Sequence, residues 1–206
     1  MAAPLQHMLH AAQTMQPRLV QFVQTLVQTP SPPGHEEAAA RLVQTEMRRL
    51  GYDDVTVDSY GNVIGQVKGG PGPTLMLNGH IDHVDPGDKT GWPHPPFSGQ
   101  IAQGHLWGRG SVDMKGPVAC MVYAPALLKE MGLTPPGDIY VTAVVMEEVG
   151  GVGSSYLATH LKTDLAVVGE PSGNTLRRGH RGRVEAQLTV TGKSIHASVP
   201  HLGVNP

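Results

Sequence analysis

The sequence has a single cysteine, Cys120, among its 206 residues. One cysteine excludes a disulfide within the chain and any zinc site built from several thiolates. Cys120 lies in an apolar stretch, so we expect a buried and unreactive thiol. The chain is therefore compatible with a reducing compartment.

Long apolar runs and an excess of one charge are also missing. No stretch approaches the ~18–20 apolar residues of a membrane span, and the N-terminus lacks the basic and apolar regions of a signal peptide. Lys and Arg number 15 against 17 Asp and Glu, so no broad surface of one charge is available for nucleic acid. We expect a cytoplasmic globular enzyme that binds neither membranes nor nucleic acids.

Two common sequence motifs of enzymes are also absent or incomplete. The serine-hydrolase motif Gly-x-Ser-x-Gly does not occur. Gly151-Val-Gly153 follows an apolar run as a dinucleotide-binding loop would, but Tyr156 stands where the third glycine is needed. Glu147 and Glu148 precede that loop, where a pyrophosphate requires positive potential.

The periodicity of apolar residues indicates alternating helices and strands. Helices are predicted over residues 18–27, 36–50, 114–131 and 154–161, and strands over 55–57, 62–67, 74–77, 139–146 and 165–168. A strand–helix–strand order favours a mainly parallel sheet flanked by helices, an α/β fold. Residues 184–190 alternate between apolar and polar, which predicts a further, half-buried strand.

Metal-binding side chains follow three of these strands. His80 and Asp82 come after residues 74–77, Glu147 and Glu148 after 139–146, and Glu170 after 165–168. Open α/β sheets bind ligands at the carboxyl ends of their strands, so we expect these side chains to converge there. His80 and Asp82 point the same way on an extended segment, which lets the carboxylate orient the imidazole.

Four motifs in this order resemble a known family. They are Asn78-Gly-His80-Ile-Asp82, Gly108-Arg-Gly-Ser-Val-Asp113-Met-Lys-Gly116, Glu147-Glu148-Val-Gly150 and Val168-Gly-Glu170-Pro171. The family is the co-catalytic metal amidohydrolases, which includes acetylornithine deacetylase, succinyl-diaminopimelate desuccinylase, aminoacylase and glutamate carboxypeptidase. The resemblance implies a zinc-exopeptidase-like catalytic domain.

The resemblance also implies roles for individual residues. His80, Asp113, Glu148 and Glu170 would bind metal, with Asp113 bridging two ions and preceding a cis peptide bond. Asp113 in a glycine-rich turn could otherwise be a simple helix cap. Asp82 would orient His80, and Glu147 would be the general base. His83 departs from the family pattern, and we expect it to face solvent.

The implied cofactors are two divalent metal ions, zinc first, with cobalt or manganese as alternatives. The implied substrate is an N-acyl amino acid or a small peptide. His196 resembles the histidine that reaches across a homodimer to the partner's site. We therefore expect a homodimer in the full-length form.

The resemblance divides the chain into an incomplete catalytic domain, residues 1–180, and the start of a lid domain, residues 181–206. His80, Asp113 and Glu170 would complete one metal site, whereas Asp113 and Glu148 lack a histidine that the family carries further along. We expect the chain to be a fragment, inactive and poorly soluble alone. The alternative is a truncated scaffold that binds metal without turnover.

Overall fold

The computed structural model describes residues 2–182, 184 and 186–206. These residues form two units, Met1–Pro171 and Ser172–Pro206. The domain boundary predicted at residues 180 and 181 stays a prediction.

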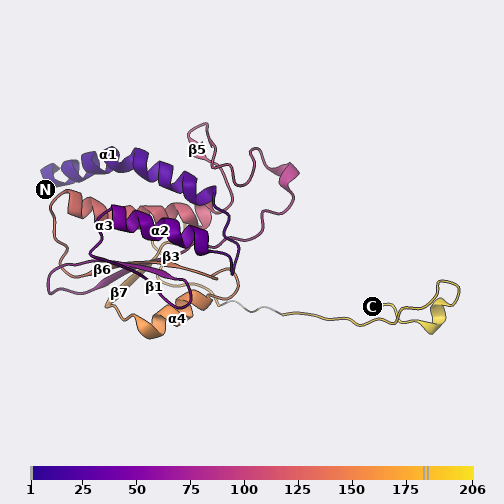
Figure 1. Cartoon of the computed structure of the whole chain (residues 1–206). Coiled ribbons are helices and arrows are strands. Elements are labelled where there is room, and N and C mark those ends of the chain that lie inside the picture. Colours follow the sequence, from indigo (N-terminus) through magenta and orange to yellow (C-terminus); the bar gives the residue numbers. More distant parts are fainter. Residues whose placement is uncertain (1, 183, 185) are drawn as a thin grey trace. The chain divides into compact units, whose positions relative to one another are not determined.

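The first unit is built on a five-stranded mixed sheet (Figure 1). In spatial order the strands are β1 (Asp54–Val57), β2 (Val63–Val67), β6 (Ile139–Val144), β3 (Leu75–His80) and β7 (Leu165–Val168). β3 runs parallel to β6 and β7, whereas β1 and β2 are antiparallel to their neighbours. The predicted α/β class is confirmed, and its parallel half carries the strands that precede His80, Glu147 and Glu170.

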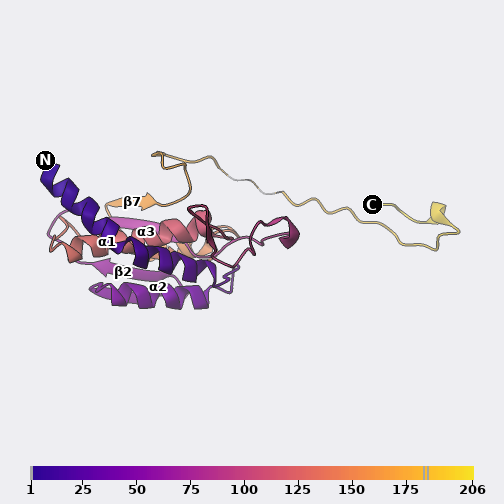
Figure 2. The ribbon, with the colours of Figure 1, turned by 90° about the horizontal axis from the view of Figure 1, so that it is seen from above.

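Helices cover both faces of this sheet. α1 (Ala2–Val27), α2 (Glu37–Arg49) and α3 (Gly116–Glu130) lie over one face, and α4 (Val152–His160) lies over the other (Figure 1). Seen from above, α1 crosses α3 while α2 lies beside them over β2 (Figure 2). α1 begins much earlier than the predicted start at residue 18, and Leu5 and Leu9 in its added turns are exposed.

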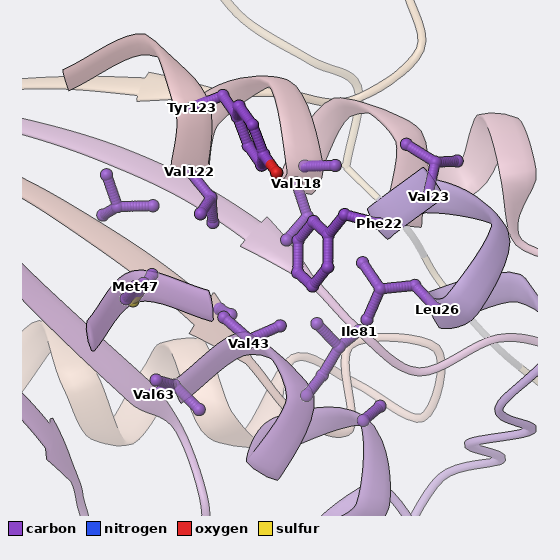
Figure 3. Close-up of a cluster of buried hydrophobic side chains, with 14 of the residues drawn as sticks. Phe22, Val23, Leu26, Val43, Met47, Val63, Ile81, Val118, Val122 and Tyr123 are labelled. Atoms are coloured by element: carbon purple, nitrogen blue, oxygen red, sulfur yellow. The ribbon is translucent and has the colours of Figure 1, made fainter. Parts of the chain in front are cut away.

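The core lies between the three helices and the sheet (Figure 3). Leu26 of α1, Val43 of α2 and Val118 of α3 meet Val63 of β2 there, and all four are buried. Burying side chains of this size stabilises a fold by about 1.5–3 kcal/mol each. This packing fixes α3, and with it the turn that precedes α3, against the sheet.

A glycine lets β3 approach the segment that leads into α3. A Cβ atom added to Gly79 would lie 2.6 Å from the Met114 Cε atom and 2.9 Å from the Val118 Cγ2 atom. Only a residue without a side chain fits this spacing. His80, the next residue, is thereby held close to the turn that carries Asp113.

Short elements complete the first unit. They are the 3₁₀ turn Lys89–Gly91, the hairpin of β4 (Ile101–Ala102) and β5 (His105–Leu106), and the π-helical turn Ser111–Lys115. Cys120, expected to be buried, is exposed, because the core-facing side of α3 is formed by Val118, Ala119 and Val122. Among the described helices, none has the length and apolar character needed to cross a bilayer.

The second unit lacks the strand predicted over residues 184–190, as far as the structure describes it. Val184, Leu188 and Val190 are 95%, 92% and 70% exposed, and residue 185 lies outside the described residues. The expectation of a half-buried strand is therefore wrong here. A strand needs a hydrogen-bonded neighbour, and the regular features described in this unit are a bridge between Lys193 and Val204 and the turn Pro200–Leu202.

Candidate metal centre

Three predicted ligands meet at the carboxyl ends of the parallel strands. His80 ends β3, Glu170 follows β7, and Asp113 lies in the turn before α3. The His80 Nε2 atom is 3.0 Å from an Asp113 carboxylate oxygen and 3.7 Å from a Glu170 carboxylate oxygen. One ligand atom from each residue lies within 4.8 Å of the other two.

These three side chains differ in exposure. His80 is 1% exposed, whereas the side chains of Asp113 and Glu170 are 54% and 44% exposed. The cluster thus has a buried wall and an open side. One imidazole and two carboxylates suit a first-row divalent metal such as zinc, and the open side leaves room for substrate.

Asp82 fixes the orientation of His80. The His80 Nδ1 atom lies 3.3 Å from the Asp82 Oδ1 atom and 3.1 Å from the Asp82 carbonyl oxygen, and both residues are buried. A proton on Nδ1 satisfies these acceptors, and Nε2, directed at Asp113 and Glu170, would bind a metal ion in place of the second ring proton. This is the tautomer that a metal ligand requires.

The same carboxylate also holds the turn that follows β6. Asp82 Oδ1 accepts the backbone N–H of Glu147 at 3.1 Å, and Asp82 Oδ2 accepts that of Glu148 at 3.0 Å. β3 and β6 are in register, with His80 opposite Val144, so the two strands end side by side. One buried carboxylate therefore positions a histidine on one strand and both glutamates after the next.

The charges of the site indicate a cation position. Burial raises the pKa of Glu148, and the nearby charges of Asp113 and Glu147 raise it further. The pKa of Glu170 is also raised, by burial and by Asp113, against the effect of His80. Burial lowers the pKa of His80, but its hydrogen bond and charge interaction with Asp82 outweigh this and raise it to about 9. Crowded carboxylates favour a proton or a cation between them.

Glu147 and Glu148, the remaining residues predicted for the catalytic domain, lie half-buried in the turn after β6. Glu148 feels the charge of Asp113, yet the two do not form a group with a third ligand among the described residues. The peptide bond between Asp113 and Met114 is cis, as the resemblance implies.

His83 does not face solvent as expected, since it is 2% exposed. The backbone N–H of Ser31 donates to its Nε2 atom at 2.9 Å, and its Nδ1 atom lies 2.8 Å from the Val84 carbonyl oxygen. Because the Nε2 atom accepts this N–H, it carries no proton and the ring is neutral, and burial lowers the pKa of His83 in the same sense. The ring joins the loop after α1 to the segment after β3.

His196 belongs to the second unit, where it is exposed and its Nδ1 atom lies 2.8 Å from the Ser198 hydroxyl. Its predicted role across a dimer stays a prediction.

Two supporting residues were not expected from the sequence. Lys115 is fully buried, and its ammonium donates to the carbonyl oxygens of Leu26 and Thr29 at 2.9 and 2.7 Å. Asn62, also fully buried, accepts the backbone N–H of Val145 at 3.0 Å. Residue 62 lies at the start of a predicted strand and Lys115 in the motif around Asp113, but their partners are distant in sequence, so only the three-dimensional contacts identify their roles.

The sequence is similar to a known peptidase family and to curated proteins. The profile of peptidase family M20/M25/M40 matches residues 76–197. The uncharacterized protein YgeY of Escherichia coli K12 is 33% identical over 206 residues, which cover 98% of this chain and 51% of YgeY. A probable succinyl-diaminopimelate desuccinylase of Staphylococcus epidermidis is 37% identical over 151 residues, 72% of this chain and 37% of that protein. The chain thus spans about half, or less, of these curated relatives.

Solved structures share the fold. Human carnosine dipeptidase 1 superposes with a TM-score of 0.70 at 22% identity, over 81% of this chain and 41% of that protein. YxeP of Bacillus subtilis, described as a dinuclear metal-binding peptidase of the M20 family, gives a TM-score of 0.55 at 16% identity, over 71% and 40% of the two chains. At these identities the similarity establishes the fold.

Proposed function

Because this chain belongs to peptidase family M20/M25/M40, we propose that it carries the metal-binding centre of a hydrolase acting on amide or peptide bonds in N-acyl amino acids or small peptides. The observation that carries the proposal is the convergence of His80, Asp113 and Glu170 within 4.8 Å at the carboxyl edge of the sheet. The desuccinylase and dipeptidase names of related proteins support this substrate class.

The residues present fit divalent metal ions, with zinc preferred and cobalt or manganese as alternatives. His80, Asp113 and Glu170 would hold one ion, and Asp113 with Glu148 would contribute to a second. Bound metal would polarise the scissile carbonyl and lower the pKa of a water molecule. The description of YxeP as dinuclear supports two ions.

Glu147 would act as the general base. It is half-buried, and its backbone N–H donates to the Asp82 Oδ1 atom, which also lies 3.3 Å from the His80 Nδ1 atom, so it lies near the metal position. Glu147 would accept the proton of the attacking water and pass it to the leaving amine. Successive residues point in different directions, which lets Glu148 bind metal while Glu147 faces the reacting atoms.

Some features rest on the family resemblance alone. A homodimer in which His196 stabilises the oxyanion of the partner's site is one of them. The cytoplasmic location is a separate expectation from the sequence pattern. Neither is needed for the metal centre itself, because its proposed ligands all come from the first unit.

A metal-binding scaffold without turnover is the second candidate. It is favoured by the pair of Asp113 and Glu148, which has no third ligand among the described residues. The test is to load the purified protein with zinc and to assay N-succinyl and N-acetyl amino acids and dipeptides before and after chelation. Zinc-dependent hydrolysis supports the hydrolase, zinc binding without hydrolysis supports the scaffold, and failure to bind zinc refutes both.

A further inference from the structure

The turn that carries Glu147 and Glu148 is held by side chains from outside it. Four successive backbone N–H groups, at residues 145–148, each donate to a side-chain oxygen at 3.0–3.1 Å. The acceptors are Asn62 for Val145, Glu36 for Met146, and Asp82 for Glu147 and Glu148. The carbonyl oxygens of Val145, Met146 and Glu147 accept backbone N–H groups of residues 150–153 at 3.0–3.2 Å. The N–H groups of the turn, by contrast, are held by these three side chains.

Met146 has the least favourable conformation in this turn. Its φ angle is 54°, in the left-handed region that residues with a Cβ atom rarely adopt. This residue turns the chain away from β6 immediately before the two glutamates. Holding Met146 in this conformation therefore decides where the Glu147 and Glu148 side chains are placed.

Glu36 supplies the bond that holds the Met146 N–H group, while the Met146 carbonyl oxygen accepts the N–H of Val152. It is 5% exposed at the start of α2, and its carboxylate makes no capping bond to its own helix. Its Oε1 atom instead accepts the Met146 N–H at 3.0 Å. Burying a carboxylate is costly unless it is hydrogen-bonded. The hydrogen bond from the Met146 N–H offsets part of this cost for Glu36.

We propose that Glu36 is a positioning residue for the Glu147–Glu148 pair, acting by keeping Met146 in the left-handed conformation. The proposal rests on the proposed function only for the roles of Glu147 as general base and Glu148 as metal ligand. Glu36 itself touches neither substrate nor metal in this account. Its loss should release Met146 to ordinary backbone conformations and displace both glutamates, so turnover should fall while substrate affinity changes little.

The test compares Glu36→Ala with Glu37→Ala. Glu37 is the adjacent control, exposed and bonded to Arg41 within the same helix. In Glu36→Ala we expect kcat to fall about 10–100-fold, as for other residues that support metal ligands, with KM changed less than about threefold. Glu36→Gln should recover most of the loss, because its amide oxygen can still accept the Met146 N–H.

A second variant separates positioning from general stability. Glycine adopts positive φ angles without strain, so Met146→Gly in the Glu36→Ala background should recover part of the lost kcat. Hydrogen exchange at the Met146 and Glu147 amides should accelerate in Glu36→Ala and stay unchanged in Glu37→Ala. Zinc affinity should fall in Glu36→Ala, since Glu148 is displaced.

Unchanged kcat, zinc affinity and amide exchange in Glu36→Ala would overturn the proposal. So would a loss that neither Glu36→Gln nor the added Met146→Gly relieves, because that pattern means a purely structural role. If the unaltered protein hydrolyses none of the substrates, the proposed function fails. The amide exchange and zinc titrations then still decide the role of Glu36.

Discussion

Asp82 Oδ2 accepts a hydrogen bond from the backbone N–H of Glu148 at 3.0 Å. The carboxylate predicted to orient a histidine thus also holds a glutamate that follows a different strand. Because its other oxygen takes the Glu147 N–H at 3.1 Å, Asp82 joins both halves of the candidate centre.

Asp82→Asn tests this double role. An asparagine side chain has one oxygen, so it can accept only part of what the carboxylate accepts, and its amide group would face a backbone N–H. We expect metal affinity or activity to fall about 10–100-fold. Isothermal titration with zinc checks this against Asp54→Asn, an exposed residue of β1, and equal affinities in the two variants would refute the role.

Glu147→Gln should separate metal binding from turnover. The amide cannot accept the water proton, whereas the three clustered ligands are untouched, so kcat should fall about 10²–10⁴-fold. Metal content, measured by atomic absorption after gel filtration, should stay the same. If Glu147→Gln loses its metal instead, the division of roles between Glu147 and Glu148 is wrong.

Gly153→Ala should disturb the turn over residues 145–148, because Gly153 packs against Val145 and against Asn62, which holds the Val145 N–H. An added Cβ atom would lie 2.3 Å from Asn62 Oδ1 and 2.4 Å from the Val145 carbonyl oxygen, and neither atom can easily move. Overpacking of this kind costs about 1–3 kcal/mol. Urea denaturation should show this loss, while Gly91→Ala, which has open space around it, should stay within about 0.5 kcal/mol of the parent. Equal stability of the two variants would contradict the packing.

Glu46 gives a prediction about pH. Burial raises its pKa, but hydrogen bonds from Arg49 and Tyr123 outweigh this and hold the pKa below the ordinary value of 4.5. A lowered carboxylate pKa stabilises the fold above the unfolded value and ceases to do so as pH falls through the folded value. We therefore expect Glu46→Gln to lower Tm by about 2–4 °C at pH 7, or about 1 kcal/mol in a chain of this size, since Arg49 is partly exposed.

The Tm difference between the parent and Glu46→Gln should then close as the pH falls below about 4.5, the ordinary value for the carboxyl group. Glu37→Gln, which alters an exposed ion pair, should show little difference at any pH. A Tm difference between the parent and Glu46→Gln that persists unchanged at low pH would mean that the charge of Glu46 does not contribute to stability.

The sequence predicted the five strands of the main sheet and the four helices, apart from the early start of α1. Strand periodicity placed His80 and Glu170 at a common edge, whereas the family resemblance was needed to add Asp113 to them. It did not predict the partners of buried polar residues. Glu36 begins the predicted helix over residues 36–50 and His83 was expected to face solvent, but their partners, Met146 and Ser31, are distant in sequence. The strand predicted over 184–190 is not formed by the described residues of that range, because an alternating pattern gives a stable strand only beside a hydrogen-bonded neighbour.

The most direct test of the metal centre is a zinc titration of the purified protein and of His80→Ala, Asp113→Ala and Asp54→Ala. The proposed metal centre should give saturable binding that Asp54→Ala retains, that His80→Ala weakens, and that Asp113→Ala weakens most, because Asp113 would contact two ions. Zinc binding that is equal in all four proteins, or absent from the parent, would contradict it.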